Sequence, residues 1–153
     1  MPKPEFDIAA AHKYFAVGCF NQAWGLIDKS DRTPEEDEMM ISLAHASIWH
    51  WTQRDDCIDR NMSIGYWQAS RIYALLGQAD NARRYGQLSL DYSKDSESFY
   101  IGFAYEALAR AESLAGNKAE SEEYLGLAKK LADSVTDAES KKMLLDDLAT
   151  IAS

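Results

Sequence analysis

The sequence predicts an all-α protein built as a stack of antiparallel helical hairpins. Three observations indicate this class: sequences that begin helices recur along the chain, glycines follow the helical runs, and no segment alternates apolar and polar residues as a strand does. With 153 residues, of which 46% are apolar and 27% charged, the chain has the length and composition of one globular domain, which we place at 1–153.

Helix starts are marked by capping sequences, in which a side chain accepts a hydrogen bond from an amide that the helix leaves free. Residues 33–36 read TPEE, a capping box with proline at the first helical position, and residues 136–139 read TDAE, a second capping box. Asn117 is a third expected cap. Gly77 and Gly116 each follow one helical run and precede the next, which is where a helix-ending glycine stands.

We expect about eight helices joined by short connections, with the last helix capping the stack. They span residues 4–17, 20–29, 34–53, 58–76, 79–93, 97–115, 118–133 and 137–152. Because a short connection returns the chain beside the helix it has just left, sequential helices are expected to be antiparallel neighbours.

Two stretches of the chain repeat each other 39 residues apart. Residues 66–92 read YWQASRIYALLGQADNARRYGQLSLDY and residues 105–131 read YEALARAESLAGNKAESEEYLGLAKKL. Aligned without a gap, they share a tyrosine, a glycine and a second tyrosine: Tyr66 with Tyr105, Gly77 with Gly116, and Tyr85 with Tyr124. A fainter copy at residues 9–28 places Gly18 at the glycine position, 59 residues before Gly77, which leaves the helix at 34–53 outside the repeat.

This order of aromatic, small and glycine positions resembles the tetratricopeptide-repeat family of helical hairpins. In that family small residues let two helices approach closely, aromatic residues fill the gaps beside them, and a glycine makes the turn. The small positions here are Ala69, Ser70, Ala82 and Ala109. The resemblance implies a right-handed superhelix whose first helices line a concave groove, and it implies a binding function. The period of 39 residues exceeds the family's usual ~34.

The family's spacing, carried onto this chain, implies which residues face the groove. In the clear copies it selects Ile64, Trp67, Arg71 and Leu75, then Phe103, Glu106, Arg110 and Leu114, and in the faint copy Ile8, His12 and Phe15. The helix at 34–53 would add Trp49 or His50 if it lies in the same layer. The predicted ligand- or partner-binding residues are therefore His12, Trp49, His50, Trp67, Arg71, Glu106 and Arg110.

Arg71 is the predicted main anchor of this groove. It lies four residues after Trp67, close enough for a cation–π contact, and Glu106 and Arg110 have the spacing of a helical ion pair. Since neighbouring hairpins stack, Arg71 is expected within reach of Glu106, which would keep its guanidinium presented to a carboxylate or carbonyl of a ligand. The alternative is a structural ion bridge on a solvated stripe that binds nothing.

Residues 45–51 read HASIWHW and raise the question of a metal site. The helix around this stretch is apolar on nearly every side, so it is expected to be core, with His45 buried and hydrogen-bonded. His45 and His50 are five residues apart, about 140° around a helix, which does not suit one ion. The catalytic and phosphate-binding motifs are missing from the sequence, so we predict no catalytic residue, metal or cofactor.

The charge of the chain argues against two classes of partner. Lys and Arg number 16 against 25 acidic residues, a net charge of −9 that repels nucleic-acid phosphates and anionic membrane surfaces. The two cysteines are too few for a disulfide framework and too far apart for a cysteine zinc site. The sequence shows neither a signal peptide nor a membrane-spanning run, so a cytoplasmic location is expected.

The leading functional hypothesis is a non-catalytic binding or adaptor protein that holds a partner in its concave groove. A peptide or protein segment is the first choice of partner, and a small molecule the second. The alternatives are an enzyme or ligand-sensing module with a closed pocket between the helices, and a subunit whose surface forms a homo-oligomer. An open groove favours a partner segment, a closed cavity with converging polar groups favours a small molecule, and a flat apolar patch favours self-association.

Overall fold

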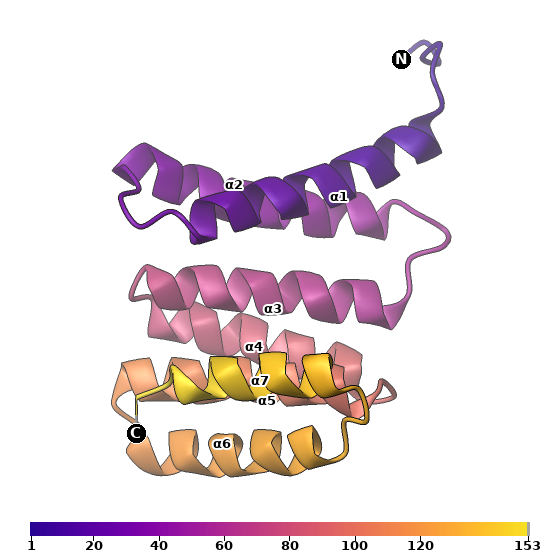
Figure 1. The fold of residues 1–153 in the computed structure, drawn as a ribbon. Coiled ribbons are helices and arrows are strands. Elements are labelled where there is room, and N and C mark those ends of the chain that lie inside the picture. Colours follow the sequence, from indigo (N-terminus) through magenta and orange to yellow (C-terminus); the bar gives the residue numbers. More distant parts are fainter. Residues whose placement is uncertain (153) are drawn as a thin grey trace.

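The computed structural model describes residues 1–152, which form seven α-helices and no strand, so the expected all-helical class is confirmed. The helices are Ile8–Ile27 (α1), Pro34–Thr52 (α2), Asp59–Leu75 (α3), Ala79–Ser93 (α4), Ser98–Ala115 (α5), Lys118–Asp133 (α6) and Ala138–Ala149 (α7) (Figure 1). None of the helices in residues 1–152 combines the length and the apolar composition that crossing a lipid bilayer requires.

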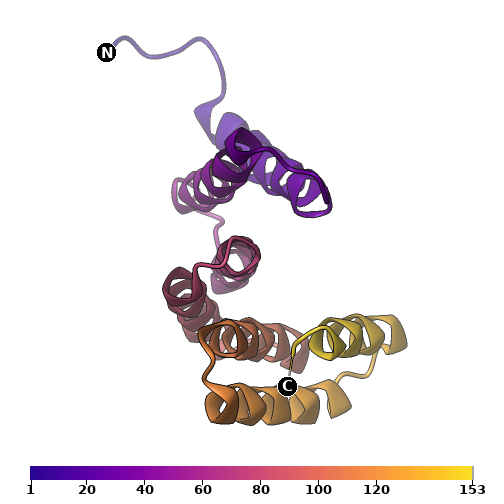
Figure 2. The ribbon, with the colours of Figure 1, turned by 90° about the vertical axis from the view of Figure 1, so that its left-hand side faces the viewer.

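Consecutive helices pair as hairpins, and the hairpins stack. The pairs are α1 with α2, α3 with α4, and α5 with α6, while α3 and α4 both contact α5 and connect the second hairpin to the third. The last helix, α7, packs against α5 and α6. Viewed nearly along the helices, the stack is C-shaped, with α1 and α7 at the two ends of its open side (Figure 2). This open side is the concave face of the molecule.

The expected number of eight helices is wrong, because the first two expected helices are one. α1 runs without a break through Gly18, and only Gly77 and Gly116 have a positive φ among the glycines of residues 1–152. A glycine inside a helix costs only about 0.5–1 kcal/mol, and the Cys19 and Phe20 side chains offer no oxygen to cap a new helix. The faint repeat copy at residues 9–28 is therefore not a hairpin. The first hairpin is α1 with α2, so the helix that the repeat left over is its second member.

The capping box at residues 33–36 and both glycine turns stand where the sequence predicts them. Thr33 Oγ1 accepts a hydrogen bond from the Glu36 amide (3.2 Å), and Glu36 Oε2 accepts one from the Thr33 amide (2.9 Å), which is the expected capping box. Gly77 and Gly116 have φ values of +74° and +82° in the turns after α3 and α5, a conformation that glycine adopts without steric cost.

Two other expected caps differ in detail. At α7 the cap is Asp137 rather than Thr136, and its carboxylate accepts a hydrogen bond from the Ser140 amide at 2.8 Å. Asn117 stands at the N-cap of α6 but makes no side-chain cap bond; its amide nitrogen donates to Glu112 at 2.6 Å. Both helices still begin within one or two residues of the expected positions.

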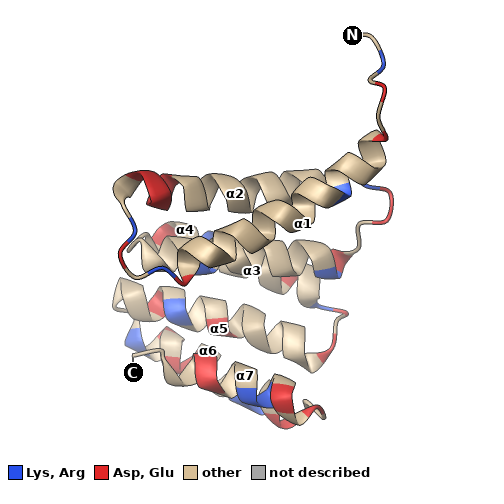
Figure 3. Ribbon diagram, turned by 45° about the horizontal axis from the view of Figure 1, so that its top comes forward, with Lys and Arg blue, Asp and Glu red and all other residues tan. Residues whose placement is uncertain are grey.

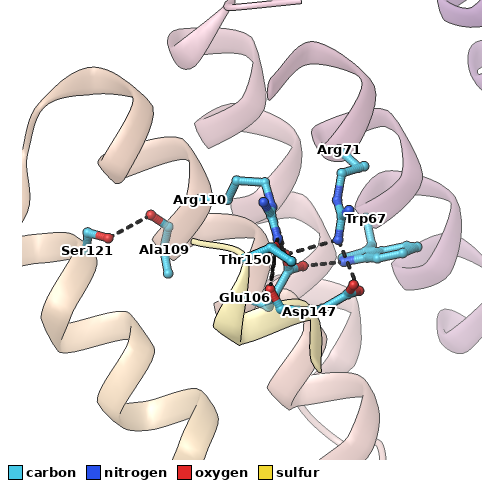
Figure 4. Close-up of polar contacts among 8 residues, drawn as sticks. All are labelled: Trp67, Arg71, Glu106, Ala109, Arg110, Ser121, Asp147 and Thr150. Carbon is cyan, nitrogen blue, oxygen red and sulfur yellow. Dashed lines mark hydrogen bonds and ion pairs between the residues drawn. The ribbon is translucent and has the colours of Figure 1, made fainter. Parts of the chain in front are cut away.

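One contact recurs in both repeated hairpins and reproduces the 39-residue register. Where α3 crosses α4, Ser70 Oγ donates to the Ala82 carbonyl at 2.7 Å. Where α5 crosses α6, the equivalent positions are Ala109 and Ser121, and Ser121 Oγ donates to the Ala109 carbonyl at 2.9 Å (Figure 4). All four residues are buried. The serine has moved to the other helix, but the close crossing and its hydrogen bond are kept.

Gly102 sets the distance between α5 and α7, because a methyl group there would lie 2.6 Å from Cδ2 of the buried Leu144. Gly126, exposed on α6, has nothing within 4 Å of the same position. We predict that Gly102→Ala is less stable than Gly126→Ala by about 1–3 kcal/mol, although both variants gain the helix propensity of alanine. Urea unfolding followed by circular dichroism measures the difference. Equal stabilities would show that α7 does not press on α5 at this point.

Candidate functional site

A cavity of about 450 Å³ lies on the concave face between α1, α3, α5 and α7. Neighbouring side chains on one face of each helix line it: Phe20 and Trp24 from α1, Ile64 and Trp67 from α3, Phe99, Tyr100 and Phe103 from α5, and Met143 and Asp147 from α7. Ser63 and Ser89 complete the wall. Most of these side chains are only partly buried and Met143 is 58% exposed, so the cavity opens to solvent.

Aromatic rings form a continuous wall across this cavity. Between ring centroids, Trp24 lies 5.5 Å from Trp67, Trp67 lies 5.3 Å from Phe103, and Phe103 lies 5.0 Å from Phe99. The last two pairs meet edge to face, an arrangement that contributes about 0.5–1.5 kcal/mol beyond the burial of the rings. The wall therefore joins α1, α3 and α5 through direct ring contacts.

Glu106 lies behind the Trp67 ring of this wall, and its side chain is fully buried. Figure 4 shows its polar contacts. Its Oε2 accepts a hydrogen bond from the Trp67 indole N–H at 2.8 Å. Its Oε1 accepts hydrogen bonds from Arg110 Nε and Nη2 at 2.8 and 2.7 Å, and from Arg71 Nη2 at 3.2 Å. A carboxylate is tolerated in the interior only when opposite charges and hydrogen bonds compensate it, and here two guanidinium groups and an indole do so.

The same two arginines fasten α7 to the stack. Arg71 Nη2 also donates to Asp147 Oδ2 at 3.0 Å. Arg110 Nη2 donates to the Asp147 carbonyl at 3.1 Å and to Thr150 Oγ1 at 2.8 Å. These bonds connect the end of α7 to α3 and α5. The network around Glu106 therefore sets the position of α7, which forms the fourth side of the cavity.

Asp147 is the point at which this network reaches the cavity. Burial raises the pKa of its carboxyl group above the usual range, while the positive charge of Arg71 opposes the rise and the negative charge of Glu106 adds to it. Oδ2 accepts the hydrogen bond from Arg71, and Oδ1 accepts none from the part of the chain that the structure describes, residues 1–152. One carboxylate oxygen therefore remains available to a ligand.

Four of the predicted site residues meet in this network. Arg71 lies 3.2 Å from Glu106, and its Cζ lies 5.5 Å from the centroid of the Trp67 ring. Arg110 pairs with Glu106 at 2.7 Å. The expected contact between Arg71 and Glu106 across neighbouring hairpins is confirmed, as are the helical ion pair and the cation–π contact. The role of Arg71 as the main ligand anchor stays a prediction.

The other expected groove residues of the repeats divide between two cavities. Ile64 and Phe103 line the 450 Å³ cavity, whereas Leu75 and Leu114 line a second cavity of about 390 Å³, farther along α3 and α5 on the other side of the network. Arg71 also lines this second cavity, together with Arg110. The arginines therefore stand behind the aromatic wall of the first cavity and not in it.

His12, Trp49 and His50 form a separate cluster and do not reach the cavity. His12 Nδ1 and His50 Nδ1 are 2.8 Å apart and share a hydrogen bond, and the Trp49 ring meets the His50 ring edge to face at 4.9 Å between centroids. Trp49 is 54% exposed. Trp49 and His50 would join the groove only if residues 34–53 lay in its layer, but no α2 side chain lines the cavity.

On α1 the structure brings different residues to the concave face from those that the repeat selected. Phe20 and Trp24 line the cavity, whereas Ile8, His12 and Phe15 do not. The prediction differed because it ended the first helix before Gly18, so that only the first half of α1 was expected to face the groove. With α1 read as one continuous helix, Phe20 and Trp24 would have been recognised as two aromatic residues four positions apart on one face.

Sequence reasoning also missed the contributions of α5 and α7 that lie outside the repeat positions. Phe99 precedes Phe103 by one helical turn, a signal that was present in the sequence. Asp147 carried no comparable signal, because it lies 76 residues after Arg71 and α7 does not belong to the repeat. Only the folded chain shows that Asp147 and Arg71 are partners.

His45 is hydrogen-bonded, as the sequence predicts, but it is half-buried rather than buried. Its Nε2 lies 2.9 Å from the Tyr73 hydroxyl oxygen. Burial lowers the pKa of His45, and the positive charge of Arg84 acts in the same direction. The pKa of His50 is also lowered, by burial first and by the neighbouring His12 second. Both side chains are therefore held preferentially in their neutral forms.

No family model, curated protein or solved structure matches this chain. In residues 1–152, no group of three or more His, Cys, Asp or Glu side chains could hold a metal ion. Cys19 and Cys57 are free. The cavity and the network behind it are therefore the features from which a function can be derived.

Replacing Glu106 tests how much the network stabilises the fold. In Glu106→Gln the new amide group places a donor either against the Trp67 indole N–H or against the guanidinium groups, and the buried negative charge is lost. We predict a loss of about 3–5 kcal/mol in the free energy of unfolding, measured by urea titration. Asp146→Asn, which removes an exposed ion pair with Lys142 on α7, is the control and should cost less than about 1 kcal/mol. Glu106→Gln as stable as this control would contradict the network.

The two shifted histidines predict a pH dependence of stability. Because their folded-state pKa values lie below the ~6.5 of an unfolded histidine, the unfolded chain binds more protons once the pH falls below that value. Their contribution is complete above ~6.5 and decreases as the pH falls toward the folded-state values. We predict that the Tm falls from about pH 7.5 to about pH 5.5, and that it falls less in His45→Gln/His50→Gln. An equal fall in both proteins would exclude these histidines as its source.

Proposed function

We propose that this protein is a non-catalytic binding protein that holds a small organic ligand in the aromatic cavity of its concave face. The cavity itself carries the proposal. Its volume of about 450 Å³ lies within the roughly 300–1,000 Å³ of small-molecule sites, and its wall is mostly aromatic with few polar groups. The network around Glu106 holds this wall in place before a ligand arrives, which lowers the ordering cost of binding.

The polar groups around the cavity favour binding over catalysis. Ser63 Oγ donates to the Ser89 carbonyl at 3.0 Å, and Ser89 Oγ donates to the Ser63 carbonyl at 2.9 Å. Neither serine is hydrogen-bonded to a histidine or a carboxylate that could act as its base, as nucleophilic catalysis requires. Glu106 already accepts hydrogen bonds on both of its oxygens. Ser63, Ser89 and Glu106 are thus arranged to hold the wall, and Asp147, the remaining acidic group, is paired with Arg71.

The arrangement of the hairpins supports a tetratricopeptide-like right-handed superhelix as the architecture of this binding face. The Ser70–Ala82 contact recurs at the equivalent positions of the next hairpin. Ile64 and Phe103, which are 39 residues apart, both line the cavity, and Trp67 hydrogen-bonds to Glu106 across the same interval. Equivalent positions of two repeats thus meet on the concave face, as the resemblance implies.

A peptide or protein segment is the second candidate, and the second cavity favours it. That cavity continues the concave face along α3 and α5 beyond Arg71 and Arg110. A segment lying along α3 could occupy both cavities, whereas a small ligand occupies only the aromatic one. Leu114→Trp, which partly fills the second cavity, would weaken the binding of a segment and leave the binding of a small ligand unchanged.

Titration with the neutral, environment-sensitive dye Prodan (6-propionyl-2-dimethylaminonaphthalene) tests the proposed function. We expect one dye per protein with blue-shifted emission, and binding that is about tenfold or more weaker in Ile64→Trp, because the larger side chain fills the cavity. Leu127→Trp, on the exposed surface of α6, is the matched control and should bind as the parent does. The proposal fails if the parent shows no saturable binding, or if Ile64→Trp binds equally well.

A further inference from the structure

We propose that the ligand of this cavity is a small organic cation, in which an apolar body carries a protonated amine or a quaternary ammonium group and Asp147 is the counter-ion. The inference rests on the proposed binding function and specifies the chemical class of the ligand. It follows from the charge, the free hydrogen-bond acceptor and the ring faces that the wall presents.

Asp147 is the only charged residue among the eleven that line the cavity. Of the arginines near its wall, Arg71 and Arg110 line the second cavity instead. Arg60, which lies over the Tyr100 ring, pairs with Glu97. Arg110 is occupied by Glu106, Thr150 and the Asp147 carbonyl, and Arg71 is divided between the two carboxylates. An anionic ligand in the aromatic cavity would therefore meet a carboxylate before it met either guanidinium group, whereas a cation would meet its counter-ion.

One oxygen of the Asp147 carboxylate has no protein donor before a ligand binds. Arg71 donates to Oδ2 only, and Oδ1 accepts no hydrogen bond from residues 1–152. Burial raises the pKa of this carboxyl group, so its charged form lacks the solvation that it would have in water. The Asp147 side chain is 30% exposed, so water reaches the carboxylate in the free protein; an ammonium group at Oδ1 would replace this water with a charge-assisted hydrogen bond, which is the stronger kind.

The aromatic wall is suited to the same kind of ligand. Cations are attracted to the negative faces of aromatic rings, most strongly to tryptophan. Two of the lining rings already have guanidinium groups over them: Arg71 Cζ lies 5.5 Å from the Trp67 centroid, and Arg60 Cζ lies 4.8 Å from the Tyr100 centroid. Trp24 packs against Trp67 and Phe20 but has no cation over its ring in residues 1–152, so the part of its ring that lines the cavity does not already hold a cation. An apolar body with a cationic end would thus contact rings along its length and a carboxylate at its end.

The charge of the whole protein favours the approach of cations. The chain carries a net charge of −9, and acidic residues are distributed along the stack from the start of α2 to α7 (Figure 3). A surface of one predominant sign raises the local concentration of oppositely charged ligands and lowers that of like-charged ones. Cations are therefore enriched, and anions depleted, around the protein as a whole.

Three soluble ligands of similar size and different charge test the proposal: 2-phenylethylammonium, 2-phenylethanol and 3-phenylpropionate. Each is titrated into the parent at neutral pH, with tryptophan fluorescence and displacement of Prodan as readouts. We expect the ammonium to bind about tenfold or more tightly than the alcohol, and the carboxylate to bind more weakly than the alcohol. In Asp147→Asn the ratio of the affinity for the ammonium to the affinity for the alcohol should shrink to about threefold or less.

A second variant keeps the test decisive if Asp147→Asn is poorly folded. Trp24→Leu preserves an apolar wall and leaves the bridge between Arg71 and Asp147 intact, but it removes one aromatic face. The preference for the ammonium over the alcohol should fall in this variant also. A preference for the ammonium that survives unchanged in every folded variant overturns the assignment of the cation to this wall.

The remaining outcomes separate this inference from the proposed function. If the alcohol binds as tightly as the ammonium, or the carboxylate binds most tightly, the cavity binds ligands but is not selective for cations, and the inference is wrong. If none of the three compounds binds while Prodan does, the binding function stands and the inference fails; if Prodan also fails, both fail. A cationic amphipathic peptide is the last comparison. If it binds and 2-phenylethylammonium does not, the concave face binds a protein partner, and the inference of a small cationic ligand is wrong.

Discussion

The buried carboxylate of Glu106 is the constraint on which the concave face depends. Because the side chain is fully buried, its charge has to be compensated locally, and the donors come from Trp67 and Arg71 on the preceding hairpin and from Arg110 on its own helix. Such a network contributes more to the choice of one arrangement than to net stability, since well-packed apolar groups could replace it at little cost. Here the network fixes the orientation of the Trp67 indole and the spacing of α3 and α5. Through Asp147 it also fixes the position of α7.

The network around Glu106 makes the cavity wall mostly apolar, because it uses the hydrogen-bonding groups of the neighbouring side chains. The indole N–H of Trp67 and most of the polar groups of the two arginines are turned away from the cavity, so its wall presents ring surfaces with Asp147 as the exception. The network thus divides the concave face into an aromatic cavity with an acidic edge and a second cavity that contains the two arginines. This separation of charge gives the face two chemically distinct ends.

The sequence predicted those parts of the site that depend on helical spacing or on the repeat. Arg71 with Trp67 and Arg110 with Glu106 are four residues apart, and the 39-residue period placed the two pairs side by side. Trp24 was missed because Gly18 was read as a turn, although packing against α2 keeps the helix intact. Asp147 could not be predicted, because α7 lies outside the repeat and tertiary packing alone brings it to Arg71. His12 and His50 pair with each other because their helices form the first hairpin, which the period of the later repeats did not describe.

Nuclear magnetic resonance of the four tryptophan indole N–H groups tests most directly whether the network builds a ligand-binding wall. With its N–H bonded to buried Glu106, the indole of Trp67 should exchange with solvent more slowly than that of exposed Trp49. Addition of Prodan should shift the Trp24 and Trp67 resonances saturably and leave Trp49 unchanged. Exchange of Trp67 as fast as Trp49, or dye-induced shifts as large at Trp49 as at Trp24, would contradict a preformed binding wall on the concave face.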